Sequence, residues 1–249
     1  MGNKLPGANK QRLLPCLRSI IFFTHAGPQA PTLLTLLMLP ALRREASAAS
    51  ASGAAPPRVV FVSSIMHLVG ALDLNDPDYT GAPITDAACM PSLRRSRADT
   101  RVCTAGSRKY SATDAYASSK LAGVTLAKEL ERRFAASGDP LASVRCLSVH
   151  PGNVLTGVVR TLPRAVQVAY RIVMGSILLS PAEGARAPVL CAAGAAPVRA
   201  PRPGPYFGSG GREEAPNPAA HDDAAQQALW AHTLRTLQLD EAALGLAKR

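Results

Sequence analysis

The sequence predicts an α/β fold in which helices flank a parallel sheet. Two short runs rich in β-branched residues, at positions 58–63 and 144–149, lack apolar–polar alternation. Such runs are typical of strands that are buried on both faces of a parallel sheet. Between them, residues 114–136 carry apolar side chains at helical spacing. Strands that alternate with helices along the chain favour a layered α/β architecture.

The segment before the first of these strands predicts one helix and one linker. Residues 32–44 follow Pro31, are apolar on all sides over 32–39 and end in basic residues, so we expect a buried helix there. Residues 47–57 are rich in Ala, Ser, Gly and Pro without periodicity, which indicates a linker. Residues 1–23 carry no clear pattern.

A long loop and a series of shorter elements are predicted downstream. Residues 73–108 are polar and interrupted by prolines, and we expect their middle, 87–107, to be a disordered insertion. Beyond the strand at 144–149, the pattern predicts helices at 163–179, 181–193 and 222–239, and a short strand at 204–207. The glycine-rich stretch 208–211 precedes charged residues and is interpreted as a turn.

Composition and charge limit the possible functions. The 249 residues suffice for one domain, 1–249, and 47% are hydrophobic against 18% charged, which is typical of a globular protein. The formal net charge of +11 favours an anionic partner such as a phosphorylated cofactor. No recognisable DNA- or RNA-reading motif accompanies that charge, so we expect no specific nucleic-acid partner.

Cysteines and histidines are scattered. The odd number of cysteines and the lack of a C-x-x-C pair argue against a disulfide framework or zinc site and fit a reducing compartment. The histidines lack metal-ligand spacing, and each is expected on the surface or in a loop. No segment approaches the roughly 18 uninterrupted apolar residues of a transmembrane helix. We therefore expect a cytoplasmic or peripherally membrane-associated protein.

The most informative motif is Tyr116-Ala-Ser-Ser-Lys120. Residues at i and i+4 lie on one helical face, so the phenol and the ammonium can converge on one substrate atom. A nearby positive charge stabilises a phenolate and lowers its pKa towards the working range of an acid/base catalyst. The spacing alone is common, and its significance depends on the motifs around it.

From residue 58 onward the chain resembles the short-chain dehydrogenase/reductase family, especially the branch with the retinol dehydrogenases and the WW-domain oxidoreductase. The resemblance rests on motifs in the family's order: Val62-Ser63-Ser64, Tyr116-x-x-x-Lys120, His150-Pro-Gly-Asn-Val-Leu-Thr156, 180–185, Tyr206-Phe207 and Leu229-Trp230. It implies a Rossmann-like parallel sheet and hydride transfer between a nicotinamide cofactor and a carbonyl or alcohol.

The resemblance also implies roles for individual residues. Tyr116 would exchange a proton with the substrate oxygen, Ser64 would hydrogen-bond that oxygen, and Lys120 would lower the tyrosine pKa and hold the nicotinamide ribose. The remaining cofactor contacts near the nicotinamide would come from Pro151, Gly152, Val154 and Thr156. Ser64 and Thr156 follow the carboxyl ends of predicted strands, where open α/β sheets build their sites.

The chain departs from the family in its first part. Family members open with a strand and a G-x-x-x-G-x-G turn that holds the cofactor pyrophosphate, and no such pair precedes Ser64 here. We therefore expect an N-terminally truncated domain without the glycine-rich βαβ portion. Residues 22–27 align either with a family strand end or with the start of the helix before Ser64. In both alignments Thr24 replaces an asparagine, which in the second belongs to the catalytic tetrad.

Two functional hypotheses follow. The preferred one is an NAD(P)-dependent oxidoreductase for an apolar alcohol or ketone, with the basic charge favouring NADP over NAD. The alternative is a catalytically inactive remnant that acts through protein–protein association. In this family the helix with the catalytic tyrosine commonly forms a dimer interface, so a homo- or heterodimer through residues 121–134 and 32–39 is expected in that case.

Overall fold

The structure is a computed structural model that describes residues 19–23, 29–73, 111–154, 178–195 and 203–246, together with positions 164 and 168. Its five-stranded sheet has the spatial order β1-β2-β3-β4-β5. The strands are β1 (Ser19–Phe23), β2 (Arg58–Val62), β3 (Arg145–Val149), β4 (Tyr206–Phe207) and β5 (Glu213–Glu214). The first four run parallel, and β5 is antiparallel to β4. The predicted parallel sheet is confirmed.

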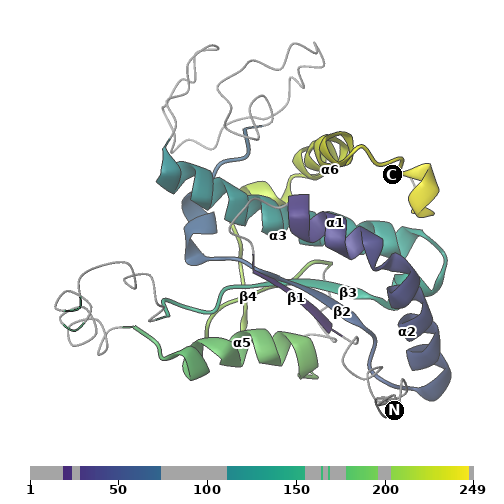
Figure 1. The fold of residues 1–249 in the computed structure, drawn as a ribbon, viewed down its shortest axis with the longest axis horizontal. Coiled ribbons are helices and arrows are strands. Elements are labelled where there is room, and N and C mark those ends of the chain that lie inside the picture. The colour runs from purple at the N-terminus through teal and green to yellow at the C-terminus, as the bar shows by residue number, and fades with distance from the viewer. Residues whose placement is uncertain are drawn as a thin grey trace, which may run out of the picture.

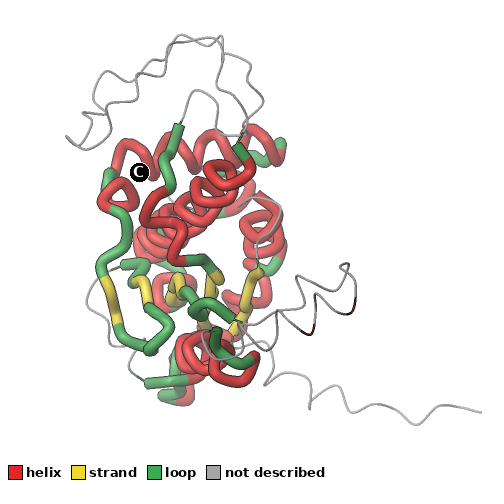
Figure 2. The backbone as a smooth tube through the Cα atoms, turned by 90° about the vertical axis from the view of Figure 1, so that its left-hand side faces the viewer, coloured by secondary structure: helices red, strands yellow, loops and turns green. Residues whose placement is uncertain are grey.

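Helices cover both faces of this sheet (Figures 1 and 2). The α-helices are α1 (Gln29–Leu37), α2 (Leu39–Ser52), α3 (Ala112–Ala136), α5 (Pro181–Ala193) and α6 (Asp223–Leu237). The short 3-10 helices are η3 (Ile65–Val69), η4 (Pro140–Ser143), η7 (Pro218–His221) and η8 (Ala242–Leu244). α1, α3 and α6 lie on one side of the sheet and α5 lies on the other (Figure 1). The arrangement is a three-layer, Rossmann-like α/β fold.

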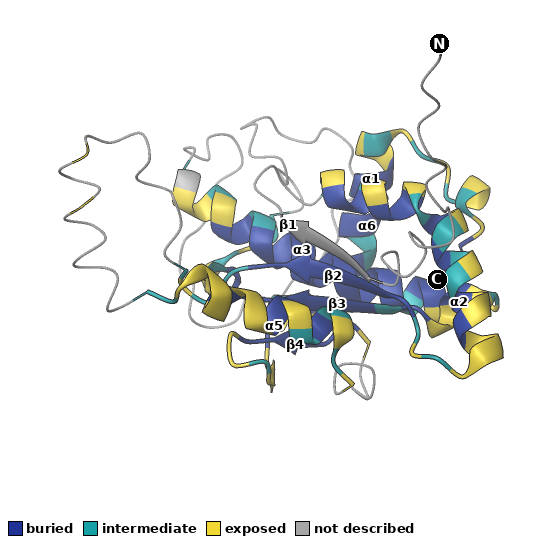
Figure 3. Cartoon of the chain, turned by 60° about the horizontal axis from the view of Figure 1, so that its bottom comes forward, coloured by how far each residue is buried: buried dark blue, intermediate teal, exposed yellow. Residues whose placement is uncertain are grey.

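Alternate side chains of β2 enter two different cores. Val59 and Phe61 pack in the cluster that includes Trp230 of α6, whereas Val60 and Val62 pack in the cluster beneath α5. Successive side chains of a strand point to opposite faces, so both faces of β2 are buried (Figure 3). This double burial explains why the sequence of this strand shows no apolar–polar alternation.

The long helix α3 runs across the centre of the structure. Its N-terminus is capped by the Ser111 hydroxyl, which accepts a hydrogen bond from the Asp114 N–H at 3.3 Å. Its apolar residues are fully buried within the chain: Leu121, Val124, Leu126, Leu130 and Phe134. The predicted helix at 114–136 is confirmed, and these five side chains are core residues of the chain itself. A dimer through this helix would have to use its other residues.

The predictions for the region before β2 were partly wrong. One helix was expected at 32–44, but α1 ends at Leu37 and α2 begins at Leu39, with Pro40 in the first turn of α2. The expected linker at 47–57 is helical as far as Ser52. Helix α2 ends there, and its C-cap residue Gly53 has a φ of +65°. Alanine, the best helix former, outweighs the serines there. Leu34 and Leu37 are exposed and not buried.

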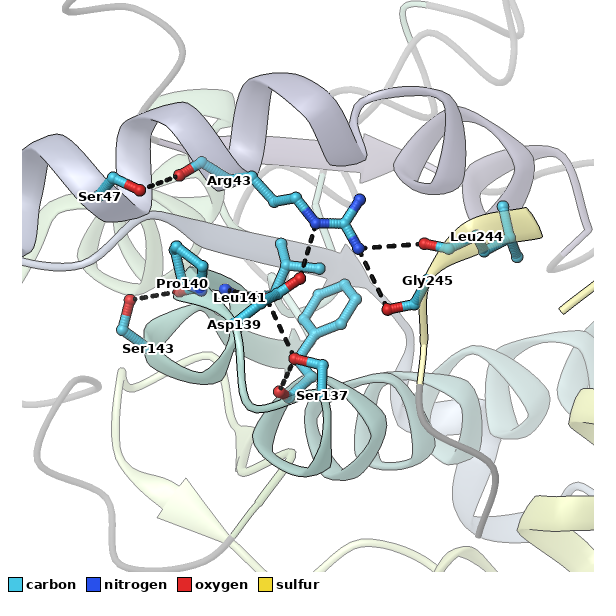
Figure 4. A network of polar contacts seen from close by, with 10 residues as sticks. Arg43, Ser47, Ser137, Asp139, Pro140, Leu141, Ser143, Leu244 and Gly245 are labelled. Atoms are coloured by element: carbon cyan, nitrogen blue, oxygen red, sulfur yellow. Dashed lines mark hydrogen bonds and ion pairs between the residues drawn. The ribbon is translucent and has the colours of Figure 1, made fainter. Parts of the chain in front are cut away.

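Arg43 of α2 ties the chain's last described turns to the rest of the fold (Figure 4). Its Nε donates to Asp139 at 2.7 Å, and its Nη2 donates to the carbonyl oxygens of Leu244 and Gly245 at 3.0 and 3.2 Å. Asp139 in turn caps η4 by accepting from the Leu141 N–H. The guanidinium therefore joins α2, η4 and η8.

The glycine-rich stretch at 208–211 is the turn of a β-hairpin. The Gly208 N–H donates to the Arg212 carbonyl at 2.9 Å, and Gly211 has a φ of +71°. The interpretation of this stretch as a turn is confirmed. The expected insertion at 87–107, most of the expected helix at 163–179, and Thr24 lie outside the described residues. Of the helices that the structure describes, none has both the length and the apolar content to cross a membrane.

Candidate active site

The candidate site is built at the carboxyl edge of β2 and β3. Val62 and Val149 are register partners at the ends of these parallel strands, and the Ser63 N–H donates to the Val149 carbonyl at 2.7 Å. The segments that follow, with Ser64 on one side and His150 on the other, therefore start at the same edge. This edge is where parallel α/β sheets place their ligands.

Ser64 joins β2 to η3. Its backbone is extended, and its Oγ accepts a hydrogen bond from the Met66 N–H at 3.3 Å, so the hydroxyl caps the short helix. The residue is half-buried. Among the residues that the structure describes, the Ser64 Oγ is used only as an acceptor, so its hydroxyl hydrogen stays available to a further acceptor.

Tyr116 and Lys120 lie one turn apart near the start of α3. The Lys120 Nζ sits 5.4 Å from the centroid of the Tyr116 ring, close enough for a cation–π contact. Tyr116 is 39% exposed, whereas Lys120 is only 4% exposed. Burial lowers the pKa of Lys120 to about 8. The spacing in the sequence therefore does bring the phenol ring and the ammonium together.

Polar contacts hold the start of α3 against the segment after β2. The buried Ser63 hydroxyl donates to the Lys120 carbonyl at 3.0 Å, and the Ala71 N–H donates to the Ser118 hydroxyl at 3.2 Å. Gly70 lies so close to the helix that an added Cβ would come within 2.5 Å of the Ala117 carbonyl oxygen. Ser64 lies between these attachment points in the chain, so the contacts fix it relative to α3.

The segment after β3 is held between α5 and the β4–β5 hairpin. Gly152 has a φ of +90°, and its N–H donates to His150 Nδ1 at 3.0 Å. A Cβ at position 152 would meet Leu179 Cδ1 at 2.5 Å. Val154 forms a bridge with Leu179 and lies against Gly184 of α5. Close packing thus requires a glycine in this turn.

The predicted residues Ser64, Tyr116, Lys120, Pro151, Gly152 and Val154 all belong to segments at this edge, whereas Thr156 lies outside the described residues. A buried ammonium, a half-exposed phenol and a tightly packed turn fit the nicotinamide and ribose half of a dinucleotide. Among the helix N-termini whose preceding residues are described, none follows a glycine-rich turn that would hold a pyrophosphate.

The prediction that each histidine lies on the surface or in a loop was wrong for His67, whereas His150 lies in the loop after β3. His67 is fully buried within η3, and His150 is 8% exposed. His67 packs on Tyr206 of β4, with ring centroids 4.5 Å apart. The sequence near His67 does not predict this burial, because Tyr206, on which the ring packs, belongs to a distant segment.

Similarity to proteins of known name extends over most of the chain. No family model matches. "Dehydrogenase/reductase SDR family member 13" from Bos taurus is 34% identical over 83% of this chain and 43% of the relative. "Polyprenol dehydrogenase" from Mus musculus is 35% identical over 82% and 49%. "Retinol dehydrogenase 13" from Homo sapiens is 29% identical over 84% and 51%. The chain spans about half the length of the curated relatives it matches.

Proposed function

Since this chain belongs to the short-chain dehydrogenase/reductase family, we propose that it is an NAD(P)-dependent oxidoreductase that interconverts an apolar alcohol and its carbonyl compound. The observation that carries this proposal is the attachment of α3 to the end of β2 through the bond from Ser63 to the Lys120 carbonyl. That attachment holds Ser64 near the helix that bears Tyr116. It supports one reaction centre made from two distant segments.

In the proposed reaction, Tyr116 and Ser64 act on the substrate oxygen, and Lys120 acts on Tyr116. Tyr116, half-exposed at the edge, donates a proton to the carbonyl oxygen or accepts one from the alcohol. Ser64 donates its hydroxyl hydrogen to the same oxygen and so stabilises the charge that develops on it. Lys120 places its Nζ 5.4 Å from the centroid of the Tyr116 ring, so a positive charge lies beside the group that exchanges the proton.

A bound nicotinamide cofactor would supply or receive the hydride, and the chain's own residues would hold its nicotinamide end. Lys120 would provide a hydrogen-bond donor for the ribose, and Pro151, Gly152 and Val154 would line the carboxamide side, to which the family resemblance also assigns Thr156. The net charge of +11 supports NADP as the cofactor over NAD, because the additional phosphate is anionic.

Apolar side chains beside the centre support an apolar substrate. Ile65, Leu68 and Val69 of η3 are 38%, 46% and 72% exposed. The end of η3 packs against α3 one residue beyond Tyr116. Two relatives carry names that refer to polyprenol and retinol, which are apolar alcohols. A hydrocarbon chain that covers η3 would bury these side chains when the alcohol group reaches Tyr116. We propose that a protein with such a substrate is located in the cytoplasm or at a membrane surface.

Cofactor titration and turnover test this proposal. We expect NADPH fluorescence to rise on binding, and Lys120→Ala to abolish the rise. Tyr116→Phe keeps the ring and should keep the binding, but it should lower turnover of an apolar aldehyde such as dodecanal by at least about 100-fold. Absence of binding at millimolar NADPH, or full turnover by Tyr116→Phe, would reject the enzyme.

A second candidate function is association with another protein chain without catalysis. The observation in its favour is the exposure of Leu34 and Leu37 on α1, at 47% and 67%. Light scattering after gel filtration tests it: Leu34→Glu combined with Leu37→Glu should convert a dimer into a monomer. A wild-type protein that is monomeric at high micromolar concentration would speak against a homodimer through this helix.

A further inference from the structure

The buried imidazole of His67 contacts the backbone carbonyl of Ser64. His67 is fully buried, and two of its groups approach the Ser64 carbonyl oxygen: its backbone N–H at 3.0 Å and its Nδ1 at 2.8 Å. A carbonyl oxygen can only accept, so Nδ1 carries the proton in this contact. Burial also lowers the pKa of His67, which favours the neutral ring. The tautomer is therefore set by Ser64 itself.

These two bonds control the orientation of Ser64. The carbonyl of a residue and its Cα–Cβ bond share one Cα, so holding the carbonyl restricts ψ and with it the direction of the side chain. The Ser64 hydroxyl is also engaged by the Met66 N–H. Both donors to the carbonyl come from His67, and one of them is a side-chain donor that a substitution can remove.

Distant segments hold His67 in turn. Its ring packs on Tyr206 of β4, with centroids 4.5 Å apart and an interplanar angle of 43°. The Nδ2 of Asn217 donates to the carbonyl oxygens of His67, Leu68 and Gly70 at 3.2, 3.0 and 3.1 Å. A single amide thus contacts two carbonyls of η3 and the carbonyl of Gly70, which follows η3 in the chain. His67 is rigidly placed by groups outside its own element.

We propose that His67 is a positioning residue for Ser64 in the reaction, and that Tyr206 and Asn217 hold it in place. The inference rests on the proposed function, because it assigns His67 an effect through the hydroxyl that contacts the substrate oxygen. A histidine that serves packing alone would affect stability without a preference for a donor at Nδ1. The two cases therefore differ in which substitution restores activity.

Two amide substitutions of His67 separate these cases. In His67→Asn the Nδ2 atom is as many bonds from Cα as Nδ1 is in histidine, so the donor to the Ser64 carbonyl is kept. His67→Gln places its donor one carbon further along, and His67→Leu has none. With NADPH and dodecanal we expect His67→Gln and His67→Leu to lower kcat by about 10- to 100-fold. We expect His67→Asn to stay within about threefold of wild type.

A control variant, Tyr206→Phe, and a measurement of NADPH affinity complete the test. Tyr206→Phe keeps the ring that packs on His67 and removes a hydroxyl without a partner among the described residues, so kcat should not change. NADPH affinity should change less than about twofold in all four variants, since no group that touches the cofactor is altered. Where His67→Leu does not fold, as judged by circular dichroism, the comparison of His67→Asn with His67→Gln decides.

Each outcome is informative. Equal rates for His67→Asn and His67→Gln in an active wild-type background would overturn the inference and leave the proposed function intact. A parallel loss of kcat and NADPH affinity in the His67 variants would also overturn the inference and leave the proposed function intact. An inactive wild-type protein would instead overturn the proposed function, and with it the role of His67 in catalysis.

Discussion

The buried ammonium of Lys120 should make the folded protein less stable than it would be with a neutral side chain at this position. Burial lowers the pKa of Lys120 from 10.5 to about 8. A difference of about 2.5 units corresponds to about 3.4 kcal/mol at neutral pH. The contact with the Tyr116 ring offsets about 1 kcal/mol of this. The remaining cost is about 2 kcal/mol.

The substitution Lys120→Met tests this cost, because it keeps an unbranched apolar stem and removes the charge. The sign follows from proton binding. Between about pH 8 and 10.5 the unfolded chain binds more protons at this residue than the folded chain, so wild-type stability rises with pH in this window. Lys120→Met should therefore be about 2 kcal/mol more stable than wild type at pH 7. That advantage should shrink towards zero near pH 10.5, while the variant loses catalytic activity at every pH.

Urea unfolding measures the difference. The chain has a single tryptophan, Trp230, which is 1% exposed in the core and provides the fluorescence signal. Arg235→Met is the matched control, because it removes an exposed cation from α6 and should change stability by less than about 0.5 kcal/mol at either pH. A Lys120→Met protein that is no more stable than wild type at pH 7, or whose advantage is the same at pH 10, would refute the reasoning.

Two further substitutions and one fragment of the cofactor test other parts of the structure. Gly152→Ala should lower the free energy of unfolding by about 1–3 kcal/mol, more than Gly53→Ala, because both glycines have positive φ but only position 152 is crowded. Arg43→Met should lower it by about 1–2 kcal/mol through lost hydrogen bonds, while Ser47→Ala should stay within about 0.5 kcal/mol. Reduced nicotinamide mononucleotide should support turnover within about tenfold of NADPH, measured as kcat/KM, because the predicted contacts are to the nicotinamide half.

The strands and the long helix were predictable because their local pattern reflects their burial. β2 is apolar at every position from Val59 to Val62, and both of its faces are covered. The proximity of Tyr116 and Lys120 was predictable for a similar reason, since the spacing of the two residues on one face is fixed by helix geometry. Where the pattern that determines a structure lies within one segment, the sequence was sufficient to predict that structure.

The missed features depend on contacts between distant segments. β1 is only five residues long, and its identity as a strand depends on pairing with β2. The burial of His67 depends on Tyr206 and on Asn217, which lies 150 positions further along the chain. The helical end of α2 was missed for another reason, because serines and a glycine concealed the helix preference of the alanines between them.

Stability and site geometry have different physical origins in this chain, so they should respond separately to substitution. The two largest apolar clusters lie on either side of β2 and β3, and their burial stabilises the fold. The candidate site is oriented by a few polar contacts between segments, such as those from Ser63 to Lys120 and from Asn217 to η3. Each of these bonds contributes about 1 kcal/mol to folding, but an error of 1 Å in placing a reacting group costs about 100-fold in rate. Variants of these contacts should therefore remain folded and lose turnover, whereas variants of the clusters should lose both.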